Sequence, residues 1–126
     1  MNNQPNDLQE LLAGLKDNDY CYLTTTGRVT GNPHEIEIWF GLNDITLYLL
    51  SGGRDRSDWV KNLLKQPSVT VRIAKQTFNA AARLVKDEAE QMLARNLLAD
   101  KYKERESDGS LSEWAQSALV VGFDVS

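Results

Sequence analysis

Residues 23–33 read LTTTGRVTGNP, and residues 51–57 read SGGRDRS. Each stretch continues a run of β-branched, aromatic or aliphatic residues into a turn that carries glycine and arginine. Such runs are typical of β-strands, whereas Gly, Asn and Pro are the residues that tight turns use. Between the two stretches, residues 35–40 (EIEIWF) alternate in the way that a half-buried strand requires. The sequence therefore predicts two arginine-bearing loops beside a β-sheet.

Short strands are predicted at six places. We expect the first two to form an antiparallel hairpin, and the tight turn at Asn43-Asp44 to make the second and third strands antiparallel neighbours as well. The six segments are 20–26, 35–40, 45–50, 69–73, 78–85 and 118–125.

Helices are predicted between the strands rather than in regular alternation with them. The first follows the cap Asn6 and ends near residues 17–19, and the second is capped by Ser57 or Asp55 and stopped by Pro67. A long amphipathic helix covers 86–103, and a short turn of helix surrounds Trp114. This order argues against a parallel sheet. The expected fold is mainly β (α+β), a six-stranded antiparallel split β-barrel with peripheral helices, formed by one domain over residues 1–126.

Composition limits the possible partners. The 126 residues carry a net charge of -4, which disfavours nucleic acid and anionic lipid. No apolar run approaches the roughly 20 residues of a membrane span. Residues 1–6 (MNNQPN) lack the features of a signal peptide, and Cys21, the only cysteine, cannot form an internal disulfide. We therefore expect a cytoplasmic protein in which any anion binds at a local basic site.

The turn at Gly52-Gly53 is a candidate for such a site. It follows a strand and precedes a helix, so its free amides lie near the positive helix end, and Arg54 and Arg56 add charge. The turn at residues 27–32 also combines donors with flexible backbone and could reach the same ligand from another side. Both segments have an alternative interpretation as ordinary solvated turns. The two loops together favour a shared anionic ligand.

Other candidate chemistry is weaker. The single histidine, His34, has no predictable relay partner, and one His with one Cys does not make a zinc site. Cys21 is expected to pack against the core rather than act as a nucleophile. Glu35 and Glu37 share one side of a strand, which is typical of a solvent or interface side. One aromatic residue among Trp39, Tyr48 and Trp59 is expected to line a pocket.

Two segments of the sequence resemble a known family. Residues 23–33 are similar to the hairpin signature of deazaflavin (F420)-dependent nitroreductases and quinone reductases, and residues 47–53, 58–63 and 67–71 resemble the second signature of that family. The family belongs to the FMN-binding split-barrel superfamily, which includes pyridoxamine 5'-phosphate oxidases. The resemblance implies a homodimer that binds coenzyme F420, or alternatively FMN. It also implies hydride transfer to a quinone, a nitro compound or another conjugated electron acceptor.

The resemblance also assigns candidate residues. It implies that Arg28, Thr30 and Asn32 approach the phosphate or acidic tail of the cofactor. The loop after the third strand would border the phosphate or ring, and three residues of the next helix would close the site. These residues are Leu50, Ser51, Gly52, Gly53 and Arg54 in the loop, and Ser57, Trp59 and Asn62 at the helix.

No catalytic side chain is expected, because the cofactor itself performs the hydride chemistry. Val29 departs from the family pattern, in which many relatives have a basic residue, and Asp58 stands where many have a small one. The first departure favours the less acidic FMN. The alternatives are an FMN-dependent reductase or oxidase, and a binding protein without turnover.

Overall fold

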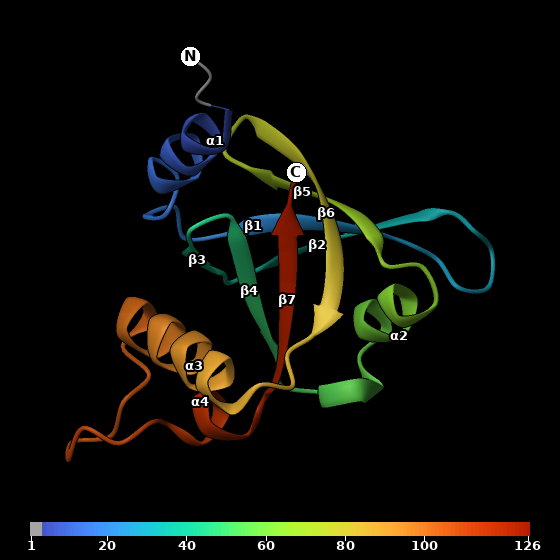
Figure 1. Ribbon diagram of the computed structural model, residues 1–126. Helices are drawn as coiled ribbons and strands as arrows, with labels where there is room; N and C mark the ends of the chain where they lie inside the picture. The colour runs from blue at the N-terminus through green and yellow to red at the C-terminus, as the bar shows by residue number, and fades with distance from the viewer. Residues whose placement is uncertain (1–3) are drawn as a thin grey trace.

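One antiparallel sheet of seven strands organises residues 4–126, which are the residues that this computed structural model describes (Figure 1). The strands follow the order β2-β1-β5-β6-β7-β4-β3 across the sheet, which curls into a half-barrel. This arrangement confirms the split-barrel expectation. The strands are β1 (Cys21–Thr26), β2 (Pro33–Ile38), β3 (Gly41–Asn43), β4 (Thr46–Ser51), β5 (Ser68–Ile73), β6 (Gln76–Leu84) and β7 (Leu119–Val125).

The expected number of strands was wrong by one, because the strand predicted over 35–40 ends at Ile38 and an additional short strand follows at 41–43. Its first part belongs to β2, which pairs only with β1 in the register Ile36↔Leu23. The chain then turns at Trp39 and Phe40, and the short strand β3 pairs with β4 instead. The expected pairing of 35–40 with 45–50 is therefore wrong, whereas the tight turn at Asn43-Asp44 is confirmed. β2 and β3 are consecutive in the chain but lie at opposite edges of the sheet.

The two halves of the sheet differ in which faces they bury. β1 and β5 alternate between buried and more exposed positions, so only one face of each packs in the core. β4 and most of β7 are buried on both faces. Their inner residues, such as Leu49 and Phe123, join the barrel core, whereas Tyr48, Leu50 and Val120 pack outward beneath helices. Continuous apolar strands are expected where helices cover a second face.

The α-helices surround this half-barrel (Figure 1). α3 (Glu88–Tyr102) and α4 (Glu113–Ser117) cover the outer face of β4 and β7, and α2 (Asp58–Lys65) lies below the β1–β2 turn. α1 (Gln4–Ala13) begins before Asn6 and ends before residues 17–19, so its predicted cap and end were wrong. A 3-10 helix, η1 (Arg54–Arg56), precedes α2. No helix within residues 4–126 is both long and apolar enough to cross a membrane.

The corner between β2 and β3 is held by the end of α3. Phe40 is fully buried, and its N–H donates to the Tyr102 hydroxyl at 3.0 Å. The Phe40 carbonyl accepts from Lys101 Nζ, also at 3.0 Å. Trp39 stacks on Tyr102 with ring centroids 4.2 Å apart and meets Trp114 edge-on. Side chains thus satisfy backbone groups that the broken strand leaves without a sheet partner.

An ionic network fastens α3 to the sheet. Arg83 on β6 donates to both carboxylate oxygens of Glu90 on α3, at 3.0 and 2.8 Å, and to Asp124 on β7 at 2.8 and 3.2 Å. The Tyr48 hydroxyl donates to Glu90 at 2.6 Å. The Arg83 guanidinium, and then the Tyr48 hydroxyl, lower the pKa of Glu90 from 4.5 to about 2. The sequence does not reveal this network because its members lie on four separate elements.

The lowered pKa of Glu90 predicts a loss of stability in acid. The folded protein holds Glu90 ionised, so its stabilising contribution is fully present above pH 4.5 and is lost as the pH falls toward 2. Urea unfolding of the wild type and of Glu90→Gln, measured from pH 7 to pH 2.5, should show a difference in unfolding free energy that shrinks in acid. Glu88→Gln, at an exposed position on the same helix turn, should retain the wild-type pH dependence. A difference between wild type and Glu90→Gln that stays constant with pH would contradict the assignment.

Candidate functional site

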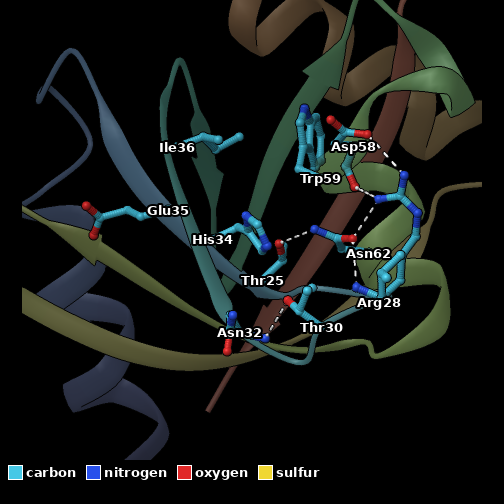
Figure 2. Close-up of a pocket in the computed structure, with 12 residues that line it drawn as sticks. Thr25, Arg28, Thr30, Asn32, His34, Glu35, Ile36, Asp58, Trp59 and Asn62 are labelled. Carbon is cyan, nitrogen blue, oxygen red and sulfur yellow. Dashed lines mark hydrogen bonds and ion pairs between the residues drawn. The ribbon is translucent and has the colours of Figure 1, made fainter.

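A cavity of about 490 Å³ lies between the β1–β2 hairpin and the start of α2. Figure 2 shows side chains from both elements converging on it. Of the site residues expected from the sequence, five line this cavity: Arg28, Thr30, Asn32, Trp59 and Asn62. The lining also includes Thr25, Gly27, Val29, His34, Glu35, Ile36 and Asp58.

Asn62 joins the helix to the hairpin. Its side chain is only 3% exposed, and its Oδ1 accepts from the backbone N–H of Arg28 at 3.1 Å and from Arg28 Nη1 at 2.8 Å. Its Nδ2 donates to the hydroxyl of buried Thr25 at 3.1 Å. A buried amide without these partners would lose the hydrogen bonds that it makes in water. Asn62 therefore fixes both the backbone and the side chain of Arg28.

Arg28 supplies the positive charge of the cavity. Besides its bond to Asn62, its Nη2 lies 3.1 Å from Asp58 Oδ1. The Asp58 side chain is 86% exposed, and such surface ion pairs contribute only about 0–1 kcal/mol. The Nε–H of Arg28 makes no hydrogen bond with any residue from 4 to 126. The guanidinium is thus oriented by Asn62, and its Nε–H is not used by the residues that the structure describes.

The hairpin turn presents further polar groups. The N–H of Gly27 donates to the Asn32 carbonyl at 2.7 Å, and the N–H of Asn32 donates to the Thr30 hydroxyl at 3.1 Å. Gly31 has a φ of 79°, which favours glycine. A Cβ on Gly27 would lie 2.7 Å from His34 Nε2, so His34 packs directly over the turn. These contacts shape the cavity wall on the hairpin side.

The second predicted loop is organised separately. Ser51 Oγ donates to the Arg54 carbonyl at 2.9 Å and lies 2.8 Å from Ser57 Oγ. Ser57 begins α2 as its cap residue, but its hydroxyl bonds to Ser51 instead of to the helix. A Cβ on Gly52 would lie 3.5 Å from the Trp114 ring. The loop is therefore closed by its own hydroxyls and packs toward α4.

This second loop does not line the cavity beside Arg28. Leu50 and Ser51 are buried, and Gly52, Gly53 and Arg54 are exposed elsewhere on the surface. The structure thus brings five of the expected residues together and leaves the other six outside that cavity. A role for those six in cofactor binding stays a prediction. They are Leu50, Ser51, Gly52, Gly53, Arg54 and Ser57.

The remaining candidates are placed as follows. Trp59 is the expected aromatic residue that lines the cavity, whereas Tyr48 is buried and Trp39 stacks at the corner. Cys21 packs in the core as expected, and burial raises the pKa of its thiol to about 12, so it is no nucleophile. Across residues 4–126, no cluster of three His, Cys, Asp or Glu side chains has the arrangement of a metal site.

Sequence reasoning missed several lining residues. His34 and Ile36 face inward because they pair with Thr25 and Leu23, whose side chains are buried. Their inward direction follows from the strand register, which the alternation of residues 33–38 signals. Asp58 opens α2 and reaches Arg28 across the cavity, a contact between distant segments that no linear pattern indicates.

Known structures share this fold at low sequence identity. An F420 reductase is 13% identical, with a TM-score of 0.63 and coverage of 90% of this chain and 91% of that chain. A proposed pyridoxamine 5'-phosphate oxidase of Listeria innocua is 19% identical, with a TM-score of 0.70 and coverage of 94% and 92%. A FAD-binding protein of Mesorhizobium loti is 13% identical, with a TM-score of 0.65 and coverage of 93% and 88%. These similarities show the fold alone.

The family can be identified from the sequence. No curated protein matches this chain significantly. The profile of the F420H(2)-dependent quinone reductase family matches residues 6–110, which include the hairpin, α2 and the cavity between them. This chain therefore belongs to the F420H(2)-dependent quinone reductase family.

Proposed function

We propose that this chain is a reductase that uses reduced F420 and passes hydride to a quinone, a nitro compound or another conjugated acceptor. The observation that carries the proposal is the cavity between the hairpin and α2, in a chain of this family. There Arg28, fixed by the buried Asn62, offers a free N–H donor to an anion. Thr30, Asn32 and the Trp59 ring complete a lining that suits a charged arm beside an aromatic group.

Each residue has a proposed role in binding. Arg28 would bind the phosphate or acidic tail through charge-assisted hydrogen bonds, and Thr30 and Asn32 would add polar contacts from the turn. Trp59 would exclude water from one side of the bound ring. F420 supplies the hydride when bound, so the side chains are needed for orientation and charge balance. The exposed residues of the second predicted loop, Gly52, Gly53 and Arg54, would meet another part of the same cofactor, and the buried Leu50 and Ser51 would support that loop.

FMN is a second candidate cofactor, and the charge of the cavity favours it. Among the lining residues Arg28 is the only Lys or Arg, and its guanidinium already lies 3.1 Å from the Asp58 carboxylate. Val29, 88% exposed, adds no charge at the turn. An acidic tail gains less attraction from such a lining than a single phosphate would.

We further propose a homodimer formed through the outer face of β1, β5 and β6. Small polar side chains on this face surround a shallow groove of about 450 Å³. No residue of α1 to α4 lines this groove. Light scattering during size-exclusion chromatography would give the molecular mass in solution. The cytoplasmic location expected from the sequence stays a prediction.

Turnover separates the proposed enzyme from a binding protein. Purified protein would be mixed with reduced F420 and either a quinone or a nitroaromatic compound, and the oxidation of F420 followed by absorbance. Acceptor-dependent oxidation supports the reductase. Tight binding without oxidation across both acceptor classes would indicate a carrier, and binding of FMN alone would indicate the FMN alternative.

Arg28→Ala should weaken F420 binding by about 1 to 3 kcal/mol, roughly 5- to 150-fold in Kd, because a charge-assisted hydrogen bond is lost. Asp58→Asn should strengthen binding slightly, because it removes a carboxylate that competes for the guanidinium. Fluorescence titration at low salt would measure both. Arg105→Ala is the matched control, since Arg105 has the same side-chain exposure and also pairs with an aspartate. Equal affinities for wild type and Arg28→Ala would contradict the assignment of Arg28.

Asn62→Ala should lower both stability and affinity. It leaves the Thr25 hydroxyl and the Arg28 N–H without their partner, which should cost about 1 to 3 kcal/mol of unfolding free energy. Urea unfolding would measure the stability change, and titration under native conditions would measure cofactor binding. Asn43→Ala, at an exposed position, should change stability by no more than about 0.5 kcal/mol. Wild-type affinity in folded Asn62→Ala would show that Arg28 does not need this support.

A further inference from the structure

A separate cavity of about 420 Å³ lies between the loop after α1, β3 and the last turns of α3. It shares no lining residue with the cavity at the hairpin. Leu42 and Leu97 form apolar parts of its wall, and Asp19 and Asp100 contribute carboxylates. Lys101 brings an amine to the same space. The proposed hydride chemistry uses none of these groups.

The Lys101 amine has an unusual environment. It donates to the Phe40 carbonyl at 3.0 Å and lies 3.6 Å from the centroid of the Phe40 ring. Within residues 4–126 it forms no ion pair with a carboxylate. Burial lowers the pKa of Lys101 from 10.5 to about 8, although Asp19, Cys21 and Asp17 oppose this change. A larger share of this amine is therefore neutral near pH 7 than is usual for lysine.

We propose that Lys101 is a selectively reactive amine that condenses with small aldehydes entering this cavity. The neutral nitrogen forms a bond to the carbonyl carbon, and the carbonyl oxygen then leaves as water, so that amine and aldehyde give imine and water. Lys101 is half-buried, its amine lies over the Phe40 ring, and the residue lines a cavity large enough for a small carbonyl compound.

The surroundings also suit the product. A protonated imine is a cation with one remaining N–H, which can keep the hydrogen bond to the Phe40 carbonyl while its charge stays over the Phe40 ring. The Asp100 carboxylate can exchange the protons that imine formation moves. Leu42 and Leu97 can contact the carbon substituent of the aldehyde.

Competitive labelling would test this proposal. The full chain would receive limiting formaldehyde with a borane reductant, whose hydride converts the imine to N-methyl-lysine, and mass spectrometry of peptides would give the rate at each lysine. We expect Lys101 to react at least about threefold faster at pH 7 than Lys103, an exposed lysine two residues away. The preference should vanish in urea. A Lys101 rate equal to or below that of Lys103 would overturn the proposal.

A variant tests how a neighbouring carboxylate affects the reactivity of the Lys101 amine. Asp19→Asn removes a carboxylate that favours the charged amine, so Lys101 labelling at pH 7 should rise, whereas Asp55→Asn on η1 should leave the rate unchanged. The backbone carbonyl of residue 19, which accepts from Tyr102, is retained. A labelling rate in Asp19→Asn at or below the wild-type rate would also overturn the proposal. The ionisable groups that face Lys101 are Lys16, Asp17, Asp19, Cys21, Asp100 and Tyr102.

Discussion

The curled sheet depends on how the chain leaves β2 and reaches the opposite edge. β2 and β3 are separated by only Trp39 and Phe40, yet they are the two opposite edge strands of the sheet. The turn buries Phe40 completely, which removes its backbone groups from water. Tyr102 and Lys101 replace the missing sheet partners. The position of α3 is therefore set by hydrogen bonds to this corner as well as by apolar packing.

Asn62 plays the corresponding role at the other end of β2. It is buried beside Thr25 and holds the Arg28 backbone, so it links the hairpin turn to α2. β2 is an edge strand that pairs only with β1. About half of the backbone N–H and C=O groups of such a strand have no partner strand, so pairing with one neighbour holds it less firmly than a central strand. Side-chain bonds from two helices therefore define where this edge lies, and with it the shape of the candidate cofactor cavity.

Sequence patterns predicted those parts of the structure that depend on local chemistry. Runs of β-branched and apolar residues predicted the strands that contain Leu23 and Val71, and Gly31 marked a turn that has a positive φ. The end of β2 at Ile38 was not predictable, because the backbone of the following turn bonds to Tyr102, which is distant in the sequence. The family resemblance implied that Arg28 and Asn62 belong to one site. The contact between Arg28 and Asp58 depends on three-dimensional packing, as does the bond between Ser51 and Ser57 that closes the second loop away from the cavity.

The two chemical environments of the chain lie at opposite ends of one strand. About six residues separate His34 at the hairpin cavity from Phe40 at the corner, which corresponds to roughly 20 Å of extended chain. At the first end, the side chain of Arg28 is held by the buried amide of Asn62. At the second, a lysine is drawn against an aromatic ring, and burial lowers its pKa. The same need to fix an edge strand with side-chain hydrogen bonds thus yields the arginine proposed to bind an anion in one place and a lysine of lowered pKa in the other.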